Sequence, residues 1–158
     1  MANATAVTIA GLVDKPTDYD TDDLAALAGQ IPDVSALAPD REGIAVSLSA
    51  VLDSAGVSDR ARFITINAEA GYSASVPLEA VRDQAILIYK LGDAPLPRDK
   101  GGPVRFLIPD VAACQTDEVD ECANVKYVES IVLSAEPGTD TRPGTIKQHI
   151  ELHLGAKP

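Results

Sequence analysis

The chain has 158 residues, of which 46% are hydrophobic and 23% charged, and its formal net charge is −11. This length suits one domain with an ordinary globular composition. The acidic charge argues against nonspecific nucleic-acid binding and against docking to an anionic membrane, because both need a basic surface. No apolar run approaches the roughly 20 residues of a membrane helix, and residues 1–10 show no signal peptide. We expect a soluble protein, either cytoplasmic or exported with its signal removed.

Strands and short helices alternate in the first half of the chain. Short acidic residues at 20–23 can cap a helix, and Gly29 can close it. A second helix is predicted from the i, i+3, i+4, i+7 spacing of Leu48, Val51, Leu52 and Ala55, and it ends at Gly56. The elements expected here are a strand at 6–10, a helix at 24–28, a loop at 30–42, a strand at 44–46 and a helix at 47–56.

Strands dominate the second half. Residues 63–67 alternate as a strand, and Ala70-Gly71 turns the chain into a hairpin partner at 72–76. The apolar run at 85–91 is typical of a strand covered on both faces. The other expected elements are a helix at 78–83, a loop at 92–103, strands at 104–108 and 125–133, and an edge-like strand within 146–154. The fold class is therefore α+β with mixed sheets, in one domain over residues 1–158.

Several motifs occur in an order that is informative. Ala94-Pro95-Leu96-Pro97 precedes Gly102-Pro103-Val104-Arg105, and Val125-Lys126-Tyr127-Val128 follows. The earlier segments of the same set are Gly11–Pro16, Val46–Leu52, Gly71-Tyr72 and Val76-Pro77-Leu78. Together, over residues 7–134, they resemble the molybdopterin-binding oxidoreductase domain of the sulfite oxidase family. The resemblance implies a mixed-sheet fold that binds molybdopterin.

The chain departs from that family at three places. The family has a molybdenum-ligating cysteine in the loop that corresponds to residues 31–39, where this chain has no cysteine and Ser35 is the one nearby nucleophile. The family's Trp-x-Gly is Gly43-Ile44-Ala45 here, and a longer segment at 111–124 replaces a compact loop. Because a soft thiolate is not simply replaced by a hydroxyl or a carboxylate, molybdopterin is a possible cofactor and molybdenum a doubtful one.

Four residues are candidates for cofactor binding: Arg105, Lys126, Tyr72 and Gly102. Arg105 offers a fork of donors that fits phosphate, and Lys126 a compact charge. The resemblance implies that both contact the phosphate region of the pterin, whereas surface ion pairing is the alternative. The resemblance also places Tyr72 near the pocket, although an aromatic residue covering the core would look the same. Asn67 is equally open between the site and turn chemistry.

The two cysteines and two histidines allow further hypotheses. Seven residues, most of them acidic or polar, separate Cys114 from Cys122, and this spacing suits a disulfide that closes a loop. Nearby acids raise thiol pKa values, which disfavours a reactive thiolate. His149 and His153 share a face in a strand or a helix, so they could join the cysteines in a metal site, but exposed surface histidines are the plainer interpretation.

The leading hypothesis is a molybdopterin-binding-like domain for an anionic phosphorylated ligand, degenerate or repurposed, with a possible protein partner. One alternative is an active molybdenum oxidoreductase of the sulfite oxidase type. The other is a structural or interaction domain without a cofactor.

Overall fold

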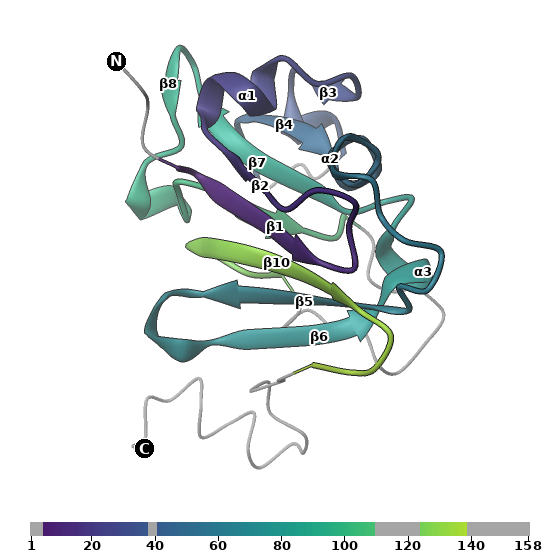
Figure 1. The fold of residues 1–158 in the computed structure, drawn as a ribbon. Helices are drawn as coiled ribbons and strands as arrows, with labels where there is room; N and C mark the ends of the chain where they lie inside the picture. Colours follow the sequence, from purple (N-terminus) through teal and green to yellow (C-terminus); the bar gives the residue numbers. More distant parts are fainter. Residues whose placement is uncertain (1–4, 38–40, 110–123, 139–158) are drawn as a thin grey trace.

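Two β-sheets face each other across the main core of the domain (Figure 1). The computed structural model describes residues 5–37, 41–109 and 124–138. The first sheet has the strand order β2-β1-β10-β5-β6, and the second has the order β3-β4-β7-β8, with β9 also paired to β7. The first sheet is built from β1 (Val7–Gly11), β2 (Thr17–Tyr19), β5 (Phe63–Ala68), β6 (Ser73–Pro77) and β10 (Val128–Ser134). The second is built from β3 (Gln30–Ile31), β4 (Ile44–Ser47), β7 (Ile86–Leu91), β8 (Ala94–Pro95) and β9 (Arg105–Leu107).

Short helices connect the strands, and their caps follow from the sequence. The α-helices are α1 (Thr21–Ala25), α2 (Leu48–Ala55) and α3 (Leu78–Val81), and the 3₁₀ turns are η1 (Val34–Ala36), η2 (Glu69–Gly71) and η3 (Arg98–Lys100). Asp20 forms a reciprocal capping box with Asp23 at the start of α1. The Ser47 hydroxyl accepts the Ala50 amide hydrogen at the start of α2, and Gly56 ends that helix in the left-handed region at φ 77°.

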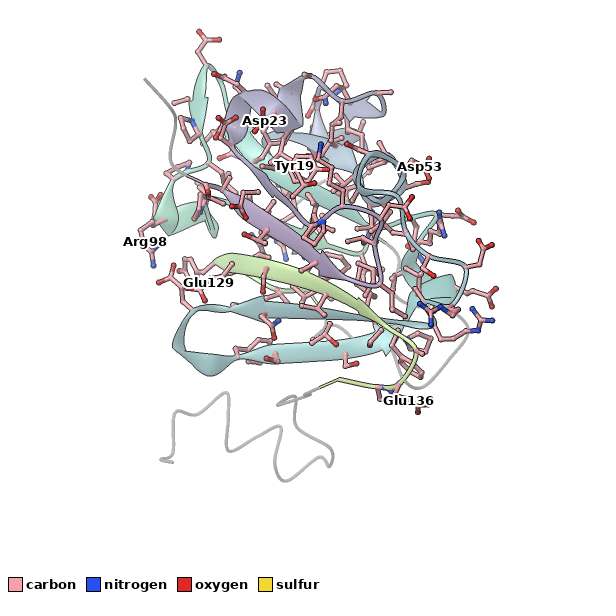
Figure 2. All side chains as sticks on the ribbon, in the orientation of Figure 1. Tyr19, Asp23, Asp53, Arg98, Glu129 and Glu136 are labelled. Carbon is pink, nitrogen blue, oxygen red and sulfur yellow. The ribbon has the colours of Figure 1, made fainter. Side chains whose placement is uncertain are left out.

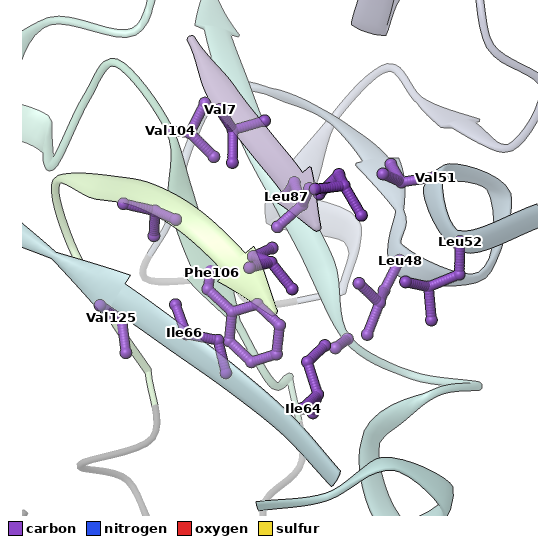
Figure 3. Packing of buried hydrophobic residues seen from close by; sticks show 14 of the residues in the cluster. Val7, Leu48, Val51, Leu52, Ile64, Ile66, Leu87, Val104, Phe106 and Val125 are labelled. Carbon is purple, nitrogen blue, oxygen red and sulfur yellow. The ribbon is translucent and has the colours of Figure 1, made fainter. Parts of the chain in front are cut away.

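The hydrophobic core lies between the two sheets, and the longer strands contribute alternate residues to it. Ile64 and Ile66 come from the first sheet, while Leu87 and Phe106 come from the second (Figure 3). Ile131 of β10 belongs to the same cluster. The other face of β7 packs into a smaller cluster, whose members are Val34, Ala45, Ile86, Ile88, Leu96 and Leu107. Successive residues of β7 therefore enter different clusters, which explains the continuous apolar run at 85–91.

The α+β class with mixed sheets is confirmed, since β1 pairs with β10 in parallel and the other ladders are antiparallel. Helix α1 has the expected length of five residues but begins and ends three residues earlier than the expected 24–28, because Asp20 rather than a later acid caps it. The expected strand at 125–133 begins only at Val128, because Tyr127 has a left-handed backbone. The expected edge strand near 146–154 lies outside the described residues.

Within the described residues, no helix has the length and apolarity required to cross a membrane.

Replacing Phe106 with alanine should strongly destabilise the domain, because its ring is fully buried between the sheets. We expect a loss of about 3–5 kcal/mol in the free energy of unfolding, measured by denaturant titration. Phe63→Ala is the matched control, since Phe63 is only half-buried, and it should cost clearly less. Equal losses for the two variants would contradict the core assignment.

Candidate anion site

A backbone bridge between the sheets brings Arg105 and Lys126 together. The Phe106 amide donates to the Val125 carbonyl at 2.8 Å, and the Val125 amide donates back at 2.9 Å. The Val128 amide adds a bond to the Val104 carbonyl at 3.0 Å. Strand β9 belongs to the second sheet and β10 to the first, so these two strands are not neighbours within one sheet. The Arg105 and Lys126 side chains come close because the bridge joins β9 to the segment that leads into β10.

Gly101 provides the space in which these two side chains approach one another. A methyl group at Gly101 would lie 3.1 Å from both the Arg105 Cδ and the Lys126 Cγ atoms. Gly101 also has a φ of 99°, a backbone conformation that other residues rarely adopt. The glycine therefore lets a guanidinium stem and an ammonium stem lie against the same buried backbone.

Tyr127 has a strained backbone beside the pair. Its φ is 59°, the only positive value of a non-glycine residue in the described part of the chain. The Tyr127 amide donates to the Gly101 carbonyl at 2.8 Å, and its carbonyl accepts the Glu69 amide hydrogen at 3.2 Å. A left-handed tyrosine costs on the order of 1 kcal/mol or more, so the surrounding bonds have to hold it.

Other charged residues surround the pair. Arg98 lies with its guanidinium carbon 5.0 Å from the centre of the Tyr127 ring, and it donates two hydrogen bonds of 2.7 Å to the Glu69 carboxylate. It projects at the edge of the molecule near the start of β10 (Figure 2). Lys100 is paired with Glu42 at 3.1 Å. The corner is thus rich in cations although the whole chain is acidic.

Arg105 is the partly buried member of this group. Burial lowers the pKa of its guanidinium, and the positive charge of Arg41 lowers that pKa further. Its Nη1 atom donates to the Lys100 carbonyl at 3.4 Å, while its Nε atom is buried and has no hydrogen-bond partner among the described residues. An anion placed here would relieve the repulsion from Arg41 and would accept the unused hydrogen bond.

The structure places the other two predicted site residues differently. Gly102 is buried against the backbone of the β8–η3 loop, where an added methyl group would lie 1.8 Å from the Leu96 carbonyl oxygen, so packing explains why it is glycine. Tyr72 follows the turn of the β5–β6 hairpin, packs against the main core and accepts the Ala68 amide hydrogen at its carbonyl. Asn67 takes part in cross-strand hydrogen bonding, donating to Ser130 and accepting from Ser73.

Ser35 lies in an exposed turn, where Asp33 binds it. Its amide and its hydroxyl both donate to the Asp33 carboxylate, and the hydroxyl bond, followed by the amide bond, lowers the pKa of Asp33. No cluster of metal-binding side chains occurs in residues 5–37, 41–109 and 124–138. The proposed disulfide of Cys114 and Cys122 and the two histidines, His149 and His153, lie outside those ranges, so these hypotheses stay predictions.

Comparisons with known proteins agree with this fold. The family described as oxidoreductase molybdopterin binding domain matches residues 43–141. The chain belongs to this family. A chain of the sulfane dehydrogenase SoxCD from Paracoccus pantotrophus shares the fold, with a TM-score of 0.61 at 21% identity. The match covers 84% of the present chain and 39% of the SoxCD chain. A comparison with curated proteins finds no match.

Reasoning from the sequence did not single out three residues that the structure places at this cationic corner. The sequence motif pointed to Gly102 and not to its neighbour Gly101. The left-handed backbone of Tyr127 has no local sequence signal, since tyrosine has no preference for that conformation. Arg41 lies in a segment predicted only as loop. The one signal that could have found it is an arginine two positions before the Gly43-Ile44-Ala45 segment in so acidic a chain.

The ion pair between Arg98 and Glu69 predicts a pH-dependent contribution to stability. The Arg98 hydrogen bonds hold the pKa of Glu69 below its ordinary value of 4.5, so this contribution is present above that pH and is lost as the pH falls through the lowered pKa. Glu69→Gln should therefore lower the melting temperature at pH 7, and the difference from wild type should shrink progressively as the pH falls below 4.5. Glu136→Gln, at an exposed position, is the control. A difference that is independent of pH would contradict the assignment.

Proposed function

We propose that this domain binds an anionic, phosphorylated cofactor of the molybdopterin type, and that Arg105 and Lys126 hold its phosphate. The observation that carries the proposal is the meeting of these two side chains across Gly101, with the Arg105 Nε atom buried and available. Membership of the molybdopterin-binding family supports the same ligand class.

Electrostatics favour this corner over the rest of the surface. A chain with a net charge of −11 repels anions, so an anion binds only where local cations outweigh the overall field. Arg105 would supply directed N–H donors and Lys126 a compact charge, while Arg41 adds to the positive potential. Gly102 and Tyr72 complete the proposed set, Gly102 by fixing the loop against Leu96 and Tyr72 as a phenol on the hairpin that carries Glu69.

The donor atoms suit the phosphate of the cofactor better than its metal. The loop at 31–39 contains no cysteine, and the Ser35 hydroxyl is engaged with Asp33. In the sulfite oxidase family, which this chain resembles, the protein ligand of molybdenum is a cysteine thiolate, and a serine oxygen is a much harder donor than a thiolate. We therefore infer a degenerate or repurposed member of the family, which retains the organic cofactor without a thiolate bond to molybdenum. When bound, a complete cofactor would supply redox chemistry, and this chain would supply the anchoring cations.

Analysis of the purified protein tests this proposal directly. The protein is produced in a host that makes the cofactor, and its pterin is measured by fluorescence after oxidation and its molybdenum by mass spectrometry. We expect pterin in amounts that Arg105→Ala reduces, with molybdenum well below one atom per pterin. Equal amounts of pterin and molybdenum would favour an active oxidoreductase, and neither component would favour a structural domain.

Substitutions at the pair should weaken the binding of simple phosphates. Arg105→Ala should raise the dissociation constant for pyrophosphate roughly 10- to 100-fold, because it removes charge-assisted bonds worth about 1.5–3 kcal/mol. Lys126→Ala should raise it about fivefold, since a point charge makes fewer directed bonds. Calorimetry at low salt measures both effects, which should shrink as salt is added. Arg60→Ala, at an exposed position that forms no part of this corner, should change little. Equal affinities for all variants would refute the site.

A further inference from the structure

If residues 125–128 formed a regular strand, the Lys126 side chain could not lie at the proposed site. Val125 and Val128 are three positions apart, yet each is 1% exposed and both belong to the main core. In an extended strand, residues three apart point to opposite faces, and residues two apart share a face. A regular strand that keeps Val128 in the core would therefore turn Lys126 toward the core as well. The left-handed backbone of Tyr127 removes this conflict.

Several contacts hold Tyr127 in that conformation. Its amide is bonded to Gly101 and its carbonyl to the Glu69 amide, so both of its backbone polar groups are engaged. The ring lies under the Arg98 guanidinium, which the Glu69 carboxylate fixes with two short bonds. The segment on either side is anchored by the hydrogen bonds of Val125 and Val128 to the strand that carries Arg105. The bend is thus set by contacts on three elements.

We propose that Tyr127 is a positioning residue for the anion site: its left-handed bend keeps the Lys126 side chain on the surface beside Gly101 and Arg105. Lys126 is exposed there, with its Cγ atom close to Gly101. The inference rests on the proposed function, because it concerns how the same anion is held. The Arg98 guanidinium lies over the Tyr127 ring.

Two substitutions separate the backbone conformation from the ring. Tyr127→Asn removes the ring but tolerates the left-handed region, whereas Tyr127→Val removes the ring and disfavours that region because of its branched Cβ. With pyrophosphate as the probe in calorimetry, we expect Tyr127→Asn to bind within about twofold of wild type. Tyr127→Val should bind about fivefold more weakly, matching Lys126→Ala. Thermal unfolding of each variant verifies that it is folded at the temperature of the titration.

A double-mutant cycle with Lys126→Ala gives the decisive readout. If Tyr127 acts through Lys126, then Tyr127→Val causes no further loss of affinity once Lys126 is alanine. Two results would overturn the positioning role, provided that Arg105→Ala still weakens binding. In one, the losses of affinity from Tyr127→Val and Lys126→Ala multiply in the double variant. In the other, Tyr127→Val binds with wild-type affinity. Absence of pyrophosphate binding by the wild-type protein, or no effect of Arg105→Ala, would instead mean that the proposed function has failed. If Tyr127→Val does not fold, a fivefold loss in Tyr127→Asn overturns the role of the bend.

Discussion

The pair of backbone hydrogen bonds between Phe106 and Val125 is the constraint on which both the core and the candidate site depend. It joins the last strand of the second sheet to the segment that enters the central strand of the first. On the inner side of this bridge, the Phe106 ring fills the space between the sheets. Arg105 and Lys126 are the chain neighbours of the two bridged residues, and the bridge holds both of their side chains close to Gly101. The same pair of backbone hydrogen bonds therefore buries the Phe106 ring and brings Arg105 close to Lys126.

Two left-handed residues allow this connection to serve both purposes. Gly101 opens the space that the two cationic stems occupy, and Tyr127 reverses the alternation so that the valines on either side of Lys126 both remain buried. Glycine meets such a requirement without strain, while tyrosine needs external support. The Glu69–Arg98 ion pair and the ring contact provide that support from a hairpin and a loop of opposite sheets. The strain and its compensation lie beside the site and not elsewhere in the described fold.

Most of the fold could be predicted from the sequence, because local patterns determined it. The capping serine and closing glycine of α2, the hairpin of β5 and β6, and the doubly buried run of β7 all have signals within a few residues. The site was predicted only in part. Arg105 and Lys126 were found through motif resemblance, but the reason that they meet is a bridge between two sheets. Of the two adjacent glycines, Gly101 lies against Lys126 and Gly102 lies against Leu96. Local sequence does not determine this choice, because it depends on these tertiary neighbours.

The separation between fold and chemistry follows from where each is encoded. The alternating apolar residues that build the two sheets preserve the family fold, and a structure with only 21% identity to this chain shares it. The chemistry of a metal centre, by contrast, depends on a few donor atoms, and residues 31–39 include no cysteine, while the Ser35 hydroxyl donates to Asp33. Anion binding needs less, since it requires local positive charge and a few free donors. Under the proposed function, phosphate binding and metal chemistry are therefore separable, because the bridge and the bend position Arg105 and Lys126 without any contribution from a metal ligand.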